Sequence, residues 1–139
     1  MTMKKQAVAA VLAAMMTLGG AFSVSAAGVG IVNLDATVQS HPKWEKAQLD
    51  MNEIEQKAEA QFEKDIDGKS DQEKQTIAQA TRKDVSDKEN AIMQPILKDV
   101  YGAIEKVRKE KGLDVVLKEA AVADGGVDIT TDVQNVLKQ

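Results

Sequence analysis

The chain has 139 residues, with 22 acidic side chains, 18 basic side chains and a formal net charge of −4. This acidic balance argues against a nucleic-acid partner, which selects for clustered lysine and arginine. The chain contains no cysteine, which excludes a disulfide framework.

The first 27 residues have the pattern of a secretory signal peptide. Two lysines precede an apolar run over residues 7–22, and small residues follow over 23–27. This order is typical of a leader that is cleaved after export, and the apolar run is short for a membrane span. Cleavage after Ala26 and cleavage after Ala27 both fit. Removal of the leader leaves 16 basic and 22 acidic residues, a net charge of −6, in a mature protein expected to be soluble.

The segment 28–35, GVGIVNLD, predicts a mostly buried strand because β-branched residues dominate it. Its apolar members are Val29, Ile31, Val32 and Leu34.

The long piece from 42 to 111 has almost no helix breakers, and it predicts a helical hairpin. Pro42 suits a first helical turn, with Ser40 or His41 as the cap. Apolar residues then follow at intervals of three and four, the spacing of a coiled-coil seam. They are Trp44, Ala47, Met51, Ile54 and Ala58, with Phe62 and Ile66 continuing at intervals of four.

The tip of the predicted hairpin lies near residues 68–70. Gly68 suits the left-handed conformation that ends a helix, and Ser70 with Glu73 has the spacing of a capping box. The returning helix comes level with the start of the outgoing one near Pro95, where a proline is expected to kink it. We therefore assign residues 42–95 to the hairpin, and 28–41 with 96–139 to a body.

The tip half of the hairpin is too polar for deep packing. Residues 63–90 hold 14 charged side chains among 28, eight acidic and six basic. Ile66, Ile77 and Val85 are its main large apolar residues. We expect this half to project into solvent, with the body holding it in place.

The C-terminal piece, 112–139, predicts a second buried strand, a candidate third strand over 121–123 and a turn at the two glycines 125 and 126. The second strand contains Val115, Val116 and Leu117. Thr130 is expected to cap a last helix, with Asp132 in its first turn. One face of that helix carries Val133, Val136 and Leu137.

No catalytic, metal or cofactor motif emerges. The sole histidine, His41, is interpreted as a cap or surface residue, because a zinc site needs further ligands at suitable spacing. The acidic segment DIDGKSDQE places its glycine out of register for a calcium loop, and a turn with a capping box explains it. We expect a protein that is not an enzyme and that needs no cofactor.

Taken together, the leader, the strand, the charged hairpin and the sequences KGLDVVL and GGVDITTDV resemble the Skp/OmpH family of periplasmic chaperones. The resemblance covers essentially the whole mature chain. It implies a jellyfish-like homotrimer in the periplasm, with a small β-rich body and three helical arms. Unfolded outer-membrane β-barrel proteins are held between these arms without ATP. The fold expected is therefore α+β.

The resemblance assigns two sets of residues. Trimer assembly is expected of Val29, Ile31, Val32, Leu34, Val115, Val116, Leu117, Val127, Ile129, Val133 and Val136. The cavity lining that holds the unfolded client is hypothesised to be Met51, Ile54, Phe62, Ile66, Ile77 and Val85.

Two departures from the family pattern limit what is carried over. The best-known members have basic arms suited to acidic lipids, whereas this mature chain is acidic, so no lipopolysaccharide or membrane site is expected. The hairpin is also short, which predicts a smaller cavity. The alternative function, with the same architecture, is a trimeric coiled-coil spacer of the cell envelope that binds no client.

Overall fold

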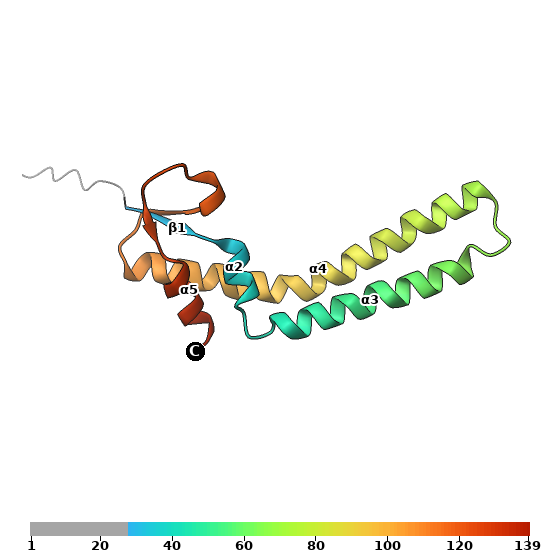
Figure 1. The fold of residues 1–139 in the computed structure, drawn as a ribbon, viewed down its shortest axis with the longest axis horizontal. Coiled ribbons are helices and arrows are strands. Elements are labelled where there is room, and N and C mark those ends of the chain that lie inside the picture. Colours follow the sequence, from blue (N-terminus) through green and yellow to red (C-terminus); the bar gives the residue numbers. More distant parts are fainter. Residues whose placement is uncertain (1–27) are drawn as a thin grey trace, which may run out of the picture.

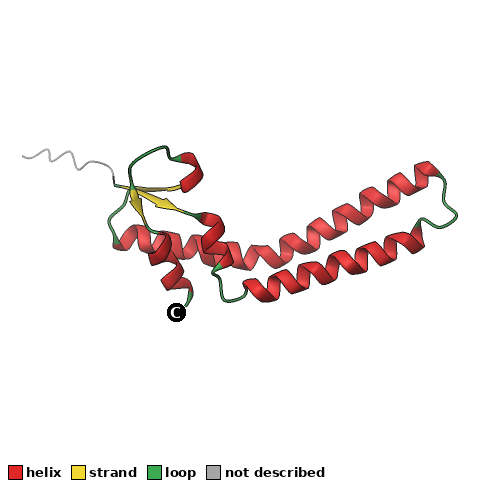
Figure 2. Cartoon of the chain, viewed as in Figure 1, coloured by secondary structure: helices red, strands yellow, loops and turns green. Residues whose placement is uncertain are grey.

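The computed structural model describes residues 28–139, and the predicted leader lies outside them. The described residues form an α+β fold, as the sequence predicts: mostly helical, with one three-stranded sheet. Figure 2 shows the strands gathered at one end of the molecule and two long helices extending from that end.

Strand β1, Val29–Val32, lies at the centre of the sheet. Strand β2, Val115–Lys118, pairs with one of its edges and β3, Val127–Asp128, with the other, both parallel to it. The register places Val29 opposite Val115. Since parallel neighbours need a crossover connection, the whole helical hairpin serves as the crossover between β1 and β2.

The prediction that Leu34 belongs to the first strand is wrong. The strand ends at Val32, and Leu34 begins helix α2, Leu34–Gln39. The side chain of Asn33 caps this helix by accepting a hydrogen bond from the Ala36 N–H at 2.9 Å. An extended residue with a short polar side chain at this position favours a helix start over a longer strand.

Helices α3, Trp44–Asp65, and α4, Asp71–Glu110, run antiparallel and form the projecting hairpin (Figure 1). Gly68 adopts a φ of 69° at the turn between them, as expected of the glycine that ends a helix. The predicted capping box is confirmed, since Ser70 and Glu73 bond each other's backbone N–H. Among residues 28–139, no helix combines the length and apolar character needed to cross a membrane.

Helix α4 runs unbroken through Pro95, and Figure 1 shows it bending where the hairpin meets the sheet end of the molecule. Ile96, directly after this proline, is the first fully buried residue of α4. Below, "arm" means residues 44–95, and "body" means the remaining described residues.

Two clusters of buried apolar side chains hold the body together. The body cluster contains Val32, Ala103, Val107, Leu113, Ile129 and Val133. The root cluster, at the base of the arm, contains Val38, Ala47, Ile96 and Val100. Ile104 and Leu137 pack against both clusters, so the base of the arm and the sheet share one continuous apolar interior.

The corner between α2 and α3 differs from the prediction, because neither Ser40 nor His41 caps α3. The helix begins after Lys43, which makes no side-chain cap, and Ser40 instead closes α2. His41 is buried at 6% exposure. Its Nε2 lies 3.2 Å from a carboxylate oxygen of Asp99 on α4, and its Nδ1 accepts the Lys43 N–H. Both ring nitrogens therefore tie this corner to its surroundings.

The C-terminal segment also departs from expectation in two details. Residues 119–121 form a short 3-10 helix, Glu119–Ala121, where part of the candidate third strand was placed, and β3 follows only after Gly126. Gly126 has a φ of 93°, and a Cβ there would come within 2.6 Å of the Ile31 side chain, so only glycine fits without displacement.

The last helix, α5, Thr130–Leu137, has no side-chain cap of its own. Thr130 is its first residue and not its cap: the Thr130 hydroxyl accepts the N–H of Asn33, while the Asp128 carboxylate accepts the Thr130 N–H. Hydrogen bonding from the Thr130 hydroxyl first, and from the Thr130 N–H second, holds the pKa of Asp128 below its ordinary value. The predicted buried face of α5 is present, with Val133 fully buried.

We predict that Ile96→Ala lowers the free energy of unfolding by about 2–5 kcal/mol, because it leaves a cavity in the root cluster. Leu49→Ala on α3 is the matched control, since Leu49 is 69% exposed, and should cost less than about 0.5 kcal/mol. Urea unfolding followed by circular dichroism measures both. Equal losses in the two variants would contradict the root cluster as the anchor of the arm.

Candidate functional site

The arm carries an open groove between its two helices. One side of the hairpin has a groove of about 940 Å³ with a floor of small and branched apolar residues and a rim of charged ones. Its lining is Ile54, Lys57, Ala58, Ala60, Gln61, Lys64, Asp65, Ile77, Ala80, Thr81, Asp84 and Lys88. We call this the large groove.

A smaller groove of about 260 Å³ lies on the other side of the hairpin. Ala58 and Thr81 line both grooves and so mark the contact line between the helices. The remaining residues of the small groove are Glu59, Phe62, Ala78 and Arg82, and none of them belongs to the large groove. The two faces of the arm therefore differ. The large groove is broad and has three lysines in its lining, whereas the small groove is narrow and contains the aromatic ring of Phe62.

The structure places the six predicted client-binding residues along the arm but does not gather them on one face. All six are half-buried, neither sealed in a core nor fully exposed. Ile54 and Ile77 line the large groove, Phe62 lines the small one, and Ile66 lies at the tip beside Asp67 and Lys74. Ile54 and Ile77 thus face one groove and Phe62 the other, while Met51 and Val85 line neither.

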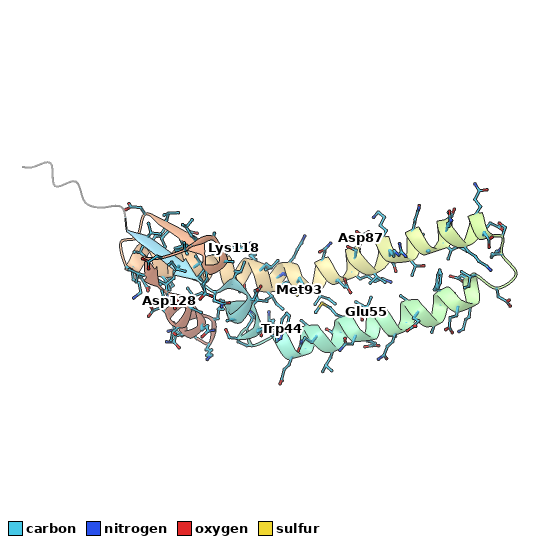
Figure 3. All side chains as sticks on the ribbon, turned by 45° about the horizontal axis from the view of Figure 1, so that its top comes forward. Trp44, Glu55, Asp87, Met93, Lys118 and Asp128 are labelled. Atoms are coloured by element: carbon cyan, nitrogen blue, oxygen red, sulfur yellow. The ribbon has the colours of Figure 1, made fainter. Side chains whose placement is uncertain are left out.

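Ion pairs run along each helix of the arm, and none in the described part of the chain joins α3 to α4. Lys57 pairs with Glu53 one turn away, and Lys88 with Asp84 at 2.7 Å. Asp87 raises the pKa of Lys83 through the same kind of contact. The two helices therefore pack mainly through apolar side chains, from the root cluster outward to Ile54, Ala58 and Ile77. Figure 3 shows Trp44 and Met93 at the root, and Glu55 and Asp87 further out.

The predicted assembly residues divide into two groups by burial. Val32, Ile129 and Val133 are sealed within the body cluster of the same chain, so they can influence assembly only through that core. Val115, Leu117 and Val127 are 40%, 39% and 49% exposed. Alternation along the strands places Val29, Ile31, Val115 and Leu117 on the outward face of the sheet, opposite the inward Val32 and Val116. On this outward face Val115 and Leu117 are exposed, whereas Val29 and Ile31 are half-buried, with Gly126 packed against Ile31.

Sequence reasoning missed the small residues of the grooves and the buried histidine. Ala60, Ala80 and Thr81 leave room between the helices, and the signal for them was the set of small residues at matching depths of the two helices. The partner of His41 is 58 residues away in the sequence, and no local pattern predicts such a pair. Among the described residues, no cluster of three or more histidine or acidic side chains could hold a metal ion.

Comparison with known proteins identifies one family. Residues 63–137 match the model of the family described as "Outer membrane protein (OmpH-like)". The match spans the returning helix of the arm and the whole C-terminal part of the body. No curated protein matches the chain.

We predict that Ser70→Ala raises the pKa of Glu73 toward its ordinary value of 4.5. In the wild-type chain the Ser70 N–H and hydroxyl hold this pKa down. The stability from this contact is present above the ordinary pKa and is lost as the pH falls through the lowered folded-state pKa.

Carboxyl NMR titration of both chains tests this. Glu105 is the internal control, because Lys109 lowers its pKa at the far end of the same helix. An unchanged Glu73 in Ser70→Ala, or a matching shift of Glu105, would contradict the capping-box origin.

Proposed function

Because the chain belongs to the OmpH-like family, we propose that it is a periplasmic, ATP-independent holdase for unfolded outer-membrane β-barrel proteins. It binds these clients between helical arms and prevents their aggregation until they are inserted. The sequence supports export, since the leader pattern precedes the described body. No catalytic step is needed for this activity.

The observation that carries the proposal is the incomplete packing of the arm. Ile54 and Ile77 stay half-exposed in a groove of about 940 Å³ whose floor also contains alanines. A segment of unfolded client that enters this groove supplies contacts that the hairpin lacks by itself. Lys57, Lys64 and Lys88 at the rim keep the arm hydrated when a client is bound, and their ammonium groups can bind client carboxylates.

Several weak grooves acting together give useful affinity. One groove offers few apolar contacts, and an open groove with few specific contacts can bind different client side chains. Linking arms through a shared body makes each later contact intramolecular, which raises overall affinity by about 10²–10⁴. This arithmetic requires an assembly, and a trimer is the state that we propose.

The outward face of the sheet is the proposed trimer interface. Val115 and Leu117 are exposed there, with half-buried Val29 and Ile31 beside them. Exposed apolar side chains that share one face of a sheet are the kind of surface that oligomers cover. This face lies in the body, so assembly leaves the arm grooves free for clients.

We predict that the processed protein keeps a urea-unfolded β-barrel protein soluble after dilution, and that native mass spectrometry finds one barrel chain per trimer. The double variant Ile54→Ser with Ile77→Ser should weaken client retention about 10-fold or more, since each groove loses two apolar side chains that a bound client would bury. The trimer mass should stay unchanged.

Leu49→Ser is the matched control, because Leu49 lies on the arm, on the same helix as Ile54, but lines neither groove. Dissociation of the double variant would make Ile54 and Ile77 structural. A wild-type trimer that leaves the barrel protein to precipitate would instead favour a spacer of the cell envelope that binds no client.

We predict that Leu117→Glu converts the trimer to monomers, because three carboxylates would be buried at one apolar interface. Sedimentation velocity measures this, with Leu49→Glu as the control of equal charge on the arm. A Leu117→Glu protein that remains trimeric would move the interface away from the outward face of the sheet.

A further inference from the structure

Both backbone polar groups of Gly28, the first described residue, form hydrogen bonds with the turn that precedes β2. Its N–H donates to the Asp114 carboxylate, with 2.8 Å between nitrogen and Oδ2. Its carbonyl accepts the Asp114 N–H at 2.8 Å and the Val115 N–H at 3.4 Å. A Cβ on Gly28 would come within 3.1 Å of the Leu113 side chain. The end of β1 is therefore seated against the turn that leads into β2.

This carboxylate is unusual among the acidic groups of the body in accepting from a backbone nitrogen 86 residues away. The nitrogen that it contacts becomes an α-amino group when the leader is cleaved after Ala27. A peptide N–H offers one proton and no charge, whereas an α-ammonium offers three protons and a full positive charge. The same contact would then become a charge-assisted hydrogen bond.

We propose that the mature chain begins at Gly28 and that its α-ammonium group pairs with Asp114, so that removal of the leader completes the body. Hydrolysis of the Ala27–Gly28 bond by water gives the Ala27 carboxylate on the leader and the Gly28 amine on the mature chain. This inference rests on the proposed export, and it is independent of client binding.

The geometry discriminates between the two cleavage sites that the sequence leaves open. Cleavage after Ala26 would place the charge on the nitrogen of residue 27, one residue further along the chain, where consecutive Cα atoms are about 3.8 Å apart. The nitrogen that lies 2.8 Å from Asp114 would then stay a neutral amide. Only a chain starting at Gly28 puts the new charge in direct contact with the carboxylate.

Other charged groups near this corner are already paired with different partners. Arg108 on α4 donates to the Leu113 carbonyl at 3.1 Å, and Lys111 pairs with Asp132 on α5 at 3.1 Å. On the opposite edge of β1, Asp128 accepts the Thr130 N–H. Asp114 is thus the acidic group that contacts the Gly28 nitrogen directly, and Arg108 is a cation that contacts the neighbouring residue, Leu113.

The pairing predicts a stability difference with a defined sign in pH. An α-amino group ordinarily has a pKa of about 7.7–8.0. A carboxylate partner raises this pKa in the folded state, so the added stability is present below the ordinary value and lost as the pH rises through the raised one. An acetylated amine carries no charge at any pH, so acetylation should cost this stability at low pH and change nothing above the raised pKa.

The experiment starts with the full chain expressed with its leader in exporting cells, and intact mass gives the first residue of the processed protein. Part of the sample is then acetylated at the α-amine at about pH 6.5, where the lysines are protonated. Urea unfolding of both forms, at one protomer concentration, is measured at about pH 6 and about pH 10. Asp114→Asn and Asp67→Asn are treated alike, Asp67 being the control at the tip of the arm.

We expect a chain that starts at Gly28 and a folding equilibrium constant about two- to five-fold larger for the free amine at the lower pH. The difference should vanish at the higher pH and in Asp114→Asn, and persist in Asp67→Asn. A different first residue, or a free-amine advantage that survives in Asp114→Asn, would overturn the proposal. Failure of client binding would leave these readouts unaffected, so the two proposals fail separately.

Discussion

The packing of the C-terminal half of α4 into the body is the contact on which the rest of the structure depends. Ile96, Val100, Ala103 and Val107 recur at helical spacing and are all buried. They contact α2 and α3 on one side and the sheet with α5 on the other. Because α4 is one continuous helix, its C-terminal half packs in the body while its N-terminal half forms one side of the arm. The direction of the arm is therefore set by core packing in the body.

Sequence patterns predict the helical hairpin well, because its helices and its turn depend on strong local signals. The glycine at the tip, the capping box and the apolar spacing of α3 and α4 each act within a few residues. The Leu34 error has a local cause, the cap by Asn33, whereas two other errors fall where a distant partner overrides a local preference. The Thr130 hydroxyl accepts the N–H of Asn33, 97 residues away, and does not cap α5. His41 is buried with its Nε2 close to the carboxylate of Asp99, 58 residues away.

The candidate site shows the same division between local and distant determinants. Helical spacing identifies Ile54, Phe62 and Ile77 as residues of the contact line between the helices. It cannot tell which of them lean into the large groove, because that depends on how far apart the helices stand and how they are rotated. Alanines from both helices line the grooves, and their matching positions become informative only once the pairing of the two helices is known.

The topology of the sheet also constrains the order in which the chain can fold. The central strand is the first element of the described chain, and both of its partners lie more than 80 residues later. Until the last quarter of the chain is present, β1 has no edge to pair with, and the buried face of α4 has no sheet to cover it. A chain threaded N-terminus first through a membrane pore thus emerges with its helices free to form and its body still open, and formation of the body is a late step that follows release of the C-terminus.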